Sequence, residues 1–118
     1  MSKFLFVLSR GPEDTTRSVR ALFLAKVAAN KGHEVTVFLV DEAVYWTNLS
    51  MAEKVRIPTG DALIDQIKEL TAKKVKFLVC KPCAEARMIS EDDLPGGFEI
   101  STAAVLIDIA EEAKVFSF

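Results

Sequence analysis

The sequence has few of the residues that build metal centres and disulfide frameworks. Its 118 residues include two cysteines and one histidine. A closed structural zinc site takes four ligands, and one chain offers only Cys80, Cys83 and His33. We therefore expect no metal within a single chain, and only a zinc ion shared between subunits stays open. His33 begins a predicted strand, where we expect it to form local hydrogen bonds.

Long apolar segments and excess positive charge are also missing. The apolar run at residues 4–8 is too short for a signal peptide, and no run reaches the roughly 18 residues that span a bilayer. Fifteen basic and seventeen acidic residues give a net charge of -2 and a pI near 5.4. This balance offers no electrostatic footprint for nucleic acid or an anionic membrane. We expect a cytoplasmic protein that binds neither directly.

Glycine is scarce, and none of it forms a phosphate-binding loop. The segment Ser9-Arg-Gly-Pro-Glu-Asp14, which follows the first apolar run, matches neither G-x-G-x-x-G nor the P-loop. Nucleotide binding has no support in the sequence, and we expect no cofactor.

Hydrophobic residues make up 50% of the chain, enough to bury a core within one domain spanning residues 1–118. Strand-like runs alternate with segments of helical period. We expect strands at 4–8, 33–40, 75–79, 98–100 and 114–118, and helices at about 15–30, from Thr59 to 74, from Pro82 and after Thr102. Such alternation predicts right-handed βαβ units. The expected fold class is therefore a three-layer α/β/α domain with a five-stranded parallel sheet.

The helix predicted over residues 15–30 suggests a contact between subunits. Its buried stripe is expected at Val19, Leu22, Phe23 and Val27. The other side carries Leu24 and Ala28, which is apolar for a face meant for water, and Phe116 and Phe118 add aromatic side chains near the last strand. We expect a homo-oligomer.

Both cysteines lie where a predicted strand gives way to a helix. Cys80 ends the strand, and Pro82 suits the first helical turn, in which Cys83 follows. Free backbone amides, the helix dipole and the charges of Lys81 and Arg87 favour a thiolate, so we expect a pKa of Cys80 below the ordinary value of about 8.5. Cytoplasmic thiols are kept reduced, so this C-x-x-C predicts a catalytic or redox-active pair.

Other candidates follow neighbouring strands, and the carboxyl ends of parallel strands meet at one edge of the sheet, where ligands bind. Ser9 follows the first strand, and Tyr45 and Trp46 follow the second. The two aromatic residues either line a site or pack in the core. We take Ser9, Tyr45 and Trp46, with Lys81 and Arg87, as candidate substrate-binding residues.

Two passages carry a resemblance to a known family. Thr16-Arg-Ser-Val-Arg-Ala-Leu followed by Gly32-His-Glu-Val-Thr-Val-Phe-Leu, and Val79-Cys-Lys-Pro-Cys-Ala-Glu-Ala-Arg-Met-Ile89, resemble the DsrE/DsrF-like family of small sulfur-relay proteins. The resemblance spans nearly the whole chain. It implies one α/β domain related to the flavodoxin-like fold, assembled into trimers or hexamers, with a persulfide-carrying cysteine after the third or fourth strand.

By its position in the motif, that cysteine is Cys80. The resemblance implies that Cys80 takes sulfane sulfur from a protein donor and passes it to a protein acceptor. Cys83 and Arg87 resemble a single-domain subset with C-x-x-C and a nearby Arg, and Cys83 could act as a resolving thiol. Two alternatives stay open: a thiol-disulfide oxidoreductase that uses the cysteine pair, and a non-enzymatic interaction subunit whose cysteines only pack.

Overall fold

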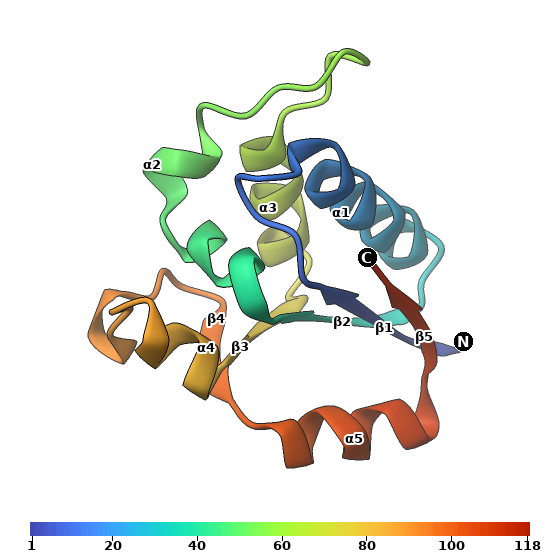
Figure 1. The fold of residues 1–118 in the computed structure, drawn as a ribbon. Coiled ribbons are helices and arrows are strands. Elements are labelled where there is room, and N and C mark those ends of the chain that lie inside the picture. The colour runs from blue at the N-terminus through green and yellow to red at the C-terminus, as the bar shows by residue number, and fades with distance from the viewer.

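The computed structural model describes residues 1–118 and contains one sheet of five parallel strands (Figure 1). These are β1 (Lys3–Leu8), β2 (Glu34–Leu39), β3 (Lys76–Cys80), β4 (Phe98–Ser101) and β5 (Lys114–Ser117). Their order in the sheet is β4-β3-β2-β1-β5, and every pairing is parallel. The predicted parallel sheet is confirmed. The structure adds the strand order, which the alternation of strands and helices does not specify.

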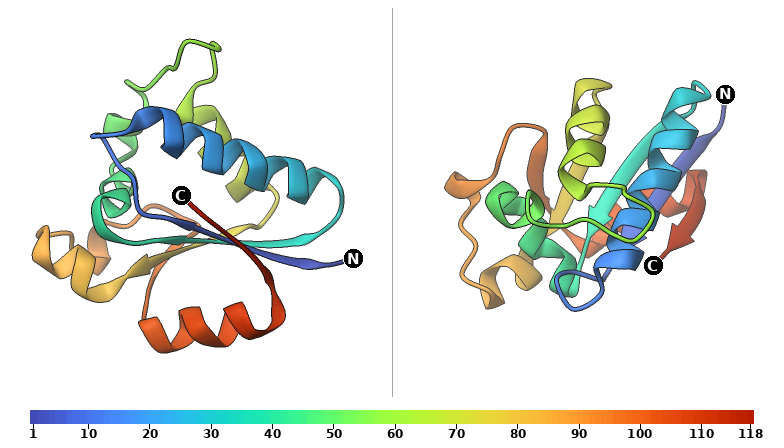
Figure 2. Two further views of the ribbon diagram at one scale, coloured as in Figure 1. Left: turned by 45° about the vertical axis from the view of Figure 1, so that its right-hand side comes forward. Right: turned by 90° about the horizontal axis from the view of Figure 1, so that it is seen from above.

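Helices cover both faces of the sheet, as the three-layer prediction requires. Helices α1 (Thr15–Asn30) and α3 (Leu63–Ala72) lie on one face, and α5 (Ala103–Glu112) lies alone on the other (Figure 2). Four short segments complete the chain: η1 (Asp41–Thr47), α2 (Leu49–Ala52), α4 (Lys81–Ala86) and η2 (Glu91–Asp93). None of the helices has the length and apolar character needed to cross a membrane.

The two faces of the sheet are buried to different degrees. The α1 and α3 side contains a cluster of 26 buried residues, whereas the α5 side has three, Leu5, Phe38 and Leu78. No residue of α5 is fully buried, and Val105, which the helical period predicts to face inward, is 39% exposed. Only Leu106 and Ile109 among its large side chains are half-buried. Helix α5 therefore buries little apolar surface on its face of the sheet.

Helix α1 begins as predicted but buries a different face. The Asp14 carboxylate caps it by accepting the Arg17 backbone N–H. Its buried residues are Ser18, Val19, Ala21, Leu22, Ala25 and Ala28. Small side chains let α1 pack against α3 as well as the sheet. Val27 is consequently exposed and Ala28 is buried, so the expected subunit contact through Ala28 is wrong.

Apolar residues of helical period in this segment predict a buried stripe, which helix α3 shows, but the helix begins later than expected. Leu63, Ile64, Ile67 and Leu70 are all buried. Thr59 does not cap the helix, because its hydroxyl donates to the Asp61 carboxylate, and the backbone of residues 56–62 closes on itself through a bridge. The helix therefore starts at Leu63.

Candidate functional site

The carboxyl ends of the strands bring the two cysteines together at one edge of the sheet. Cys80 is the last residue of β3, and Cys83 lies in the first turn of α4, which has Pro82 at its start. Both thiols are free and half-buried. Cys80 packs against the small cluster under α5, whereas Cys83 packs against the large cluster on the other face. The two cysteines thus contact the hydrophobic clusters on the two opposite faces of the sheet.

The environment of Cys80 does not favour the thiolate. Burial raises the pKa of Cys80 above its ordinary value, and the neighbouring Cys83 thiol and the negative charge of Asp41 raise it further. The backbone amide of Cys83 acts in the opposite direction but is outweighed. The expected depression of this pKa is therefore wrong. Helix α4 has only six residues, and the Arg87 charge is directed to a carboxylate.

Asp41 is the site residue that the sequence motifs do not single out. It follows β2 directly, and its Oδ1 accepts a hydrogen bond from the Cys83 Sγ at 3.8 Å. Its backbone is left-handed, with φ of 50°. Aspartate tolerates this region better than most residues. Its position after β2, at the carboxyl edge that holds the cysteines, is the signal that could have identified it.

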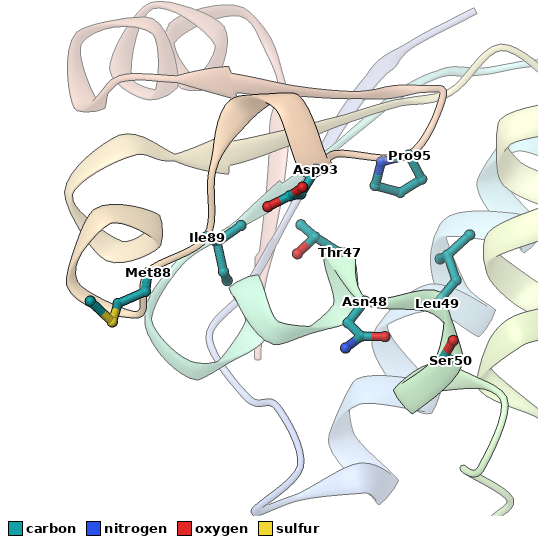
Figure 3. Close-up of a pocket in the computed structure, with 8 residues that line it drawn as sticks. All are labelled: Thr47, Asn48, Leu49, Ser50, Met88, Ile89, Asp93 and Pro95. Atoms are coloured by element: carbon teal, nitrogen blue, oxygen red, sulfur yellow. The ribbon is translucent and has the colours of Figure 1, made fainter.

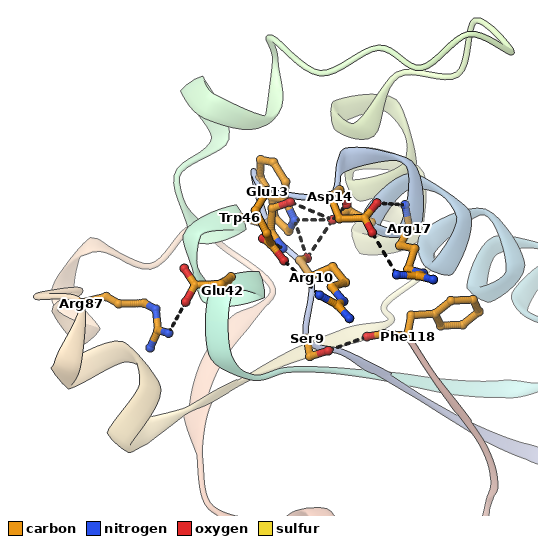
Figure 4. A network of polar contacts seen from close by, with 11 residues as sticks. Ser9, Arg10, Glu13, Asp14, Arg17, Glu42, Trp46, Arg87 and Phe118 are labelled. Carbon is orange, nitrogen blue, oxygen red and sulfur yellow. Dashed lines mark hydrogen bonds and ion pairs between the residues drawn. The ribbon is translucent and has the colours of Figure 1, made fainter.

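Arg87 is paired with Glu42, the residue of η1 that follows Asp41. Its Nη2 donates to Glu42 Oε1 at 2.5 Å (Figure 4). Its Nη1 donates to the Cys83 carbonyl oxygen at 3.1 Å. The guanidinium carbon also lies 5.9 Å from the centre of the Tyr45 ring. This pairing raises the pKa of Arg87. Arg87 therefore fastens α4 to η1, and Tyr45 lies half-buried beside this contact.

The other predicted site residues, Trp46, Ser9 and Lys81, each lie in a different environment. Trp46 is 2% exposed, and its indole N–H donates to the Ser18 hydroxyl and the Arg10 carbonyl oxygen, so of the two roles open to it, Trp46 has the packing one (Figure 4). The Ser9 hydroxyl donates to the Phe118 backbone oxygen and fixes β5 beside β1. Lys81 is exposed at the first turn of α4 and forms no ion pair.

A hollow of about 460 Å³ lies at the same edge but does not contain the thiols. It lies between the η1–α2 connection and the segment that follows α4 (Figure 3). Its lining residues are Thr47, Asn48, Leu49, Ser50, Met88, Ile89, Asp93 and Pro95. Met88 is 94% exposed at its rim. Neither Cys80 nor Cys83 is among the residues that line this hollow.

The structure gathers no three His, Cys, Asp or Glu side chains in a geometry that could hold a metal ion. The Nδ1 of His33 accepts the Ser2 backbone N–H at 3.0 Å, so this histidine forms a structural hydrogen bond, but its partner is 31 positions away and not local in sequence as expected.

Comparison with known proteins gives relatives over nearly the full chain. An uncharacterized protein of Methanocaldococcus jannaschii, MJ0989, is 30% identical over 94% of each chain, and an uncharacterized protein of Methanopyrus kandleri, MK0008, is 32% identical over 91% of this chain and 85% of its own. The crystal structure of the Escherichia coli protein ychN superposes with a TM-score of 0.80 at 27% identity and covers both chains completely. The model of the DsrE/DsrF-like family matches residues 2–118. The chain therefore belongs to the DsrE/DsrF-like family.

Proposed function

We propose that this protein is an intracellular sulfur relay in which Cys80 carries sulfane sulfur as a persulfide. The observation that supports this best is the pair of free, half-buried thiols at the carboxyl edge of a DsrE/DsrF-like sheet. Half-burial leaves the Cys80 sulfur reachable by a donor while shielding a bound persulfide from bulk solvent.

The relay consists of two balanced transfers. The Cys80 thiolate attacks the terminal sulfur of a donor persulfide, which forms the Cys80 persulfide and releases the donor thiolate. An acceptor thiolate then attacks the terminal sulfur of that persulfide and regenerates Cys80. Because the pKa of Cys80 is raised, the thiol form dominates at neutral pH, and each loading event begins with removal of its proton. The Lys81 ammonium is the free positive charge nearest in sequence to the resulting anion.

We propose that the protein works as a homo-oligomer, a trimer or hexamer as in the proteins it resembles, together with a protein donor and a protein acceptor. Its largest exposed apolar side chains, apart from the rim residue Met88 and the terminal Met1, include Ile107 at 59%, Val115 at 48% and Phe116 at 43%. Ile107 lies on α5, which covers one face of the sheet, and Val115 and Phe116 lie on the edge strand β5 that follows it. The outer edge of β5 also has unpaired backbone groups. Apolar surface beside a free strand edge is typical of an interface.

Intact mass spectrometry after incubation with a low-molecular-weight persulfide tests the relay. The parent and Cys83→Ser proteins should gain about 32 Da, a gain that a thiol reductant reverses, and Cys80→Ser should gain nothing. Equal loading of Cys80→Ser and parent would exclude Cys80 as the carrier.

The same three proteins separate the alternatives. Catalytic reduction of insulin disulfides by the parent would favour the oxidoreductase, although the all-parallel sheet lacks the antiparallel hairpin of the thioredoxin fold. A variant without both cysteines that retains a partner in full would favour the interaction subunit.

A further inference from the structure

The contact between Cys83 and Asp41 gives the second cysteine a proton acceptor. The Cys83 S–H points to Asp41 Oδ1 at 3.8 Å, within the longer range of hydrogen bonds that involve sulfur. The two residues are 42 positions apart in the chain and come from different elements, α4 and η1. Local sequence does not produce this contact; the ends of β2 and β3 bring it together.

The segment that carries Asp41 is held from two sides. Arg87, which directly follows α4, donates to both the Glu42 carboxylate and the Cys83 carbonyl oxygen, so it ties the residue after Asp41 to the backbone of Cys83. On the other side, the loop after β1 lies so close that a Cβ added to Gly11 would fall 2.2 Å from the Glu42 carbonyl oxygen.

The backbone of Asp41 is in a conformation that an L residue adopts at a cost. At φ of 50° it is left-handed, and such residues persist where the surrounding structure holds them. Asp41 begins η1 immediately after β2, so this conformation turns the chain and directs the carboxylate toward α4. The fixed backbone of Asp41 and the position of the Cys83 thiol together set the geometry of this hydrogen bond.

We infer that Asp41 is the acid-base residue of a resolving step, in which its carboxylate takes the Cys83 proton as the Cys83 sulfur attacks the persulfide on Cys80. This inference rests on the proposed function, because it requires sulfur to be carried on Cys80.

The step is balanced without an external oxidant. The Cys83 sulfur forms a bond to the inner sulfur of the Cys80 persulfide, and the bond between that sulfur and the terminal sulfur breaks. The terminal sulfur leaves with the electron pair and receives the proton that Asp41 took from Cys83. The products are the Cys80–Cys83 disulfide and hydrogen sulfide, and a cellular dithiol returns the disulfide to two thiols. With two residues between them at a strand-to-helix turn, the two cysteines can reach the Cα separation of about 4.4–6.8 Å that a disulfide needs.

Other charged groups near Asp41 are already engaged or lie further along their elements. On η1, Glu42 is paired with Arg87, which directly follows α4, and Tyr45 lies against the same guanidinium. On α4, Lys81 and Glu85 are exposed, and β3 contributes Cys80. Asp41 is the carboxylate that contacts the thiol of Cys83.

The test is a single-turnover experiment on the parent, Asp41→Asn and the control Asp108→Asn. Asn tolerates the left-handed backbone and is nearly isosteric with Asp, so the fold is preserved while the base is lost. Asp108 is exposed on α5 and forms no ion pair or side-chain hydrogen bond. Each protein is loaded with a low-molecular-weight persulfide, freed of the donor, and followed by intact mass and by sulfide release.

All three proteins should load equally, and Asp41→Asn should release sulfide about 100-fold more slowly than the other two. Added imidazole, a small external base, should restore much of the lost rate in Asp41→Asn, an effect that a structural role would not show. Asp41→Gly, which also accepts the left-handed backbone, serves as a second variant if Asp41→Asn unfolds.

Release from Asp41→Asn at the parent's rate, or a slowed release that imidazole leaves unchanged, would overturn the inference. A parent that loads but never releases sulfide would also overturn it, and would leave the carrier role intact. A parent that does not load at all would instead remove the proposed function.

Discussion

Replacing Gly11 with alanine should destabilise the fold through the contact between the β1 loop and η1. The new Cβ would lie 2.2 Å from the Glu42 carbonyl oxygen and 2.7 Å from its carbon, and both distances are shorter than the 3.4 Å at which ordinary contacts begin. Both atoms are backbone, so the strain cannot be relieved by rotating a side chain. Overpacking of this kind costs about 1–3 kcal/mol, a large part of the roughly 5–15 kcal/mol that stabilises a domain.

Chemical denaturation measures this loss directly as the free energy of unfolding, and thermal unfolding should show a melting temperature lower by about 4–12 °C. Gly96→Ala is the matched control, since nothing lies within 4 Å of its added Cβ and its φ is not positive. The control should match the parent or be more stable by up to about 1 kcal/mol. If Gly11→Ala unfolded at the same denaturant concentration as Gly96→Ala, the packing argument for the Glu42 segment would fail.

Two other predictions concern pH and assembly. The raised pKa of Cys80 favours its neutral form in the folded state, so its contribution to stability is complete below the ordinary pKa and is lost as pH rises through the folded-state pKa. Denaturation between pH 7 and 10 should show a smaller loss of stability for Cys80→Ser than for the parent, and identical slopes would contradict this. Light scattering at micromolar concentration should give a multiple of the 13.0 kDa chain mass. Ile107→Glu should lower the measured mass, whereas Met88→Glu should leave it unchanged. A parent mass of 13 kDa would refute assembly.

Most of the fold could be predicted because its signals are local. The apolar runs of β1, β2 and β3, the Asp14 cap and the stripe of α3 each depend on residues close in sequence. The strand order and the buried side of α1 depend on contacts between distant elements. Alanines on α1 can lie against α3 or against solvent, and their hydrophobicity is too small to decide between the two.

The site could be predicted only in part for the same reason. The C-x-x-C spacing places Cys80 and Cys83 together whatever the rest of the chain does. The sign of the charge around them depends on η1, which contributes Asp41 and withdraws Arg87 into a pair with Glu42. A count of nearby cations along the sequence therefore gave the wrong direction for the pKa of Cys80. The packing role of Trp46 could not be predicted either, because the groups of Ser18 and Arg10 that accept its indole N–H lie far earlier in the chain.

The place of β5 beside β1 has a consequence for the chain as it leaves the ribosome. Strands β1 to β4 are adjacent in order, so each can pair with its predecessor as it emerges, but the other edge of β1 waits for β5. Leu5, Phe38 and Leu78 likewise stay uncovered until α5 has been made. From Leu39 at the end of β2 to Ser117 at the end of β5 the chain grows by 78 residues, which takes about 4–16 s at roughly 5–20 residues per second. During this time the nascent sheet exposes an unpaired strand edge and an apolar face together. Surfaces of this kind bind chaperones and promote aggregation.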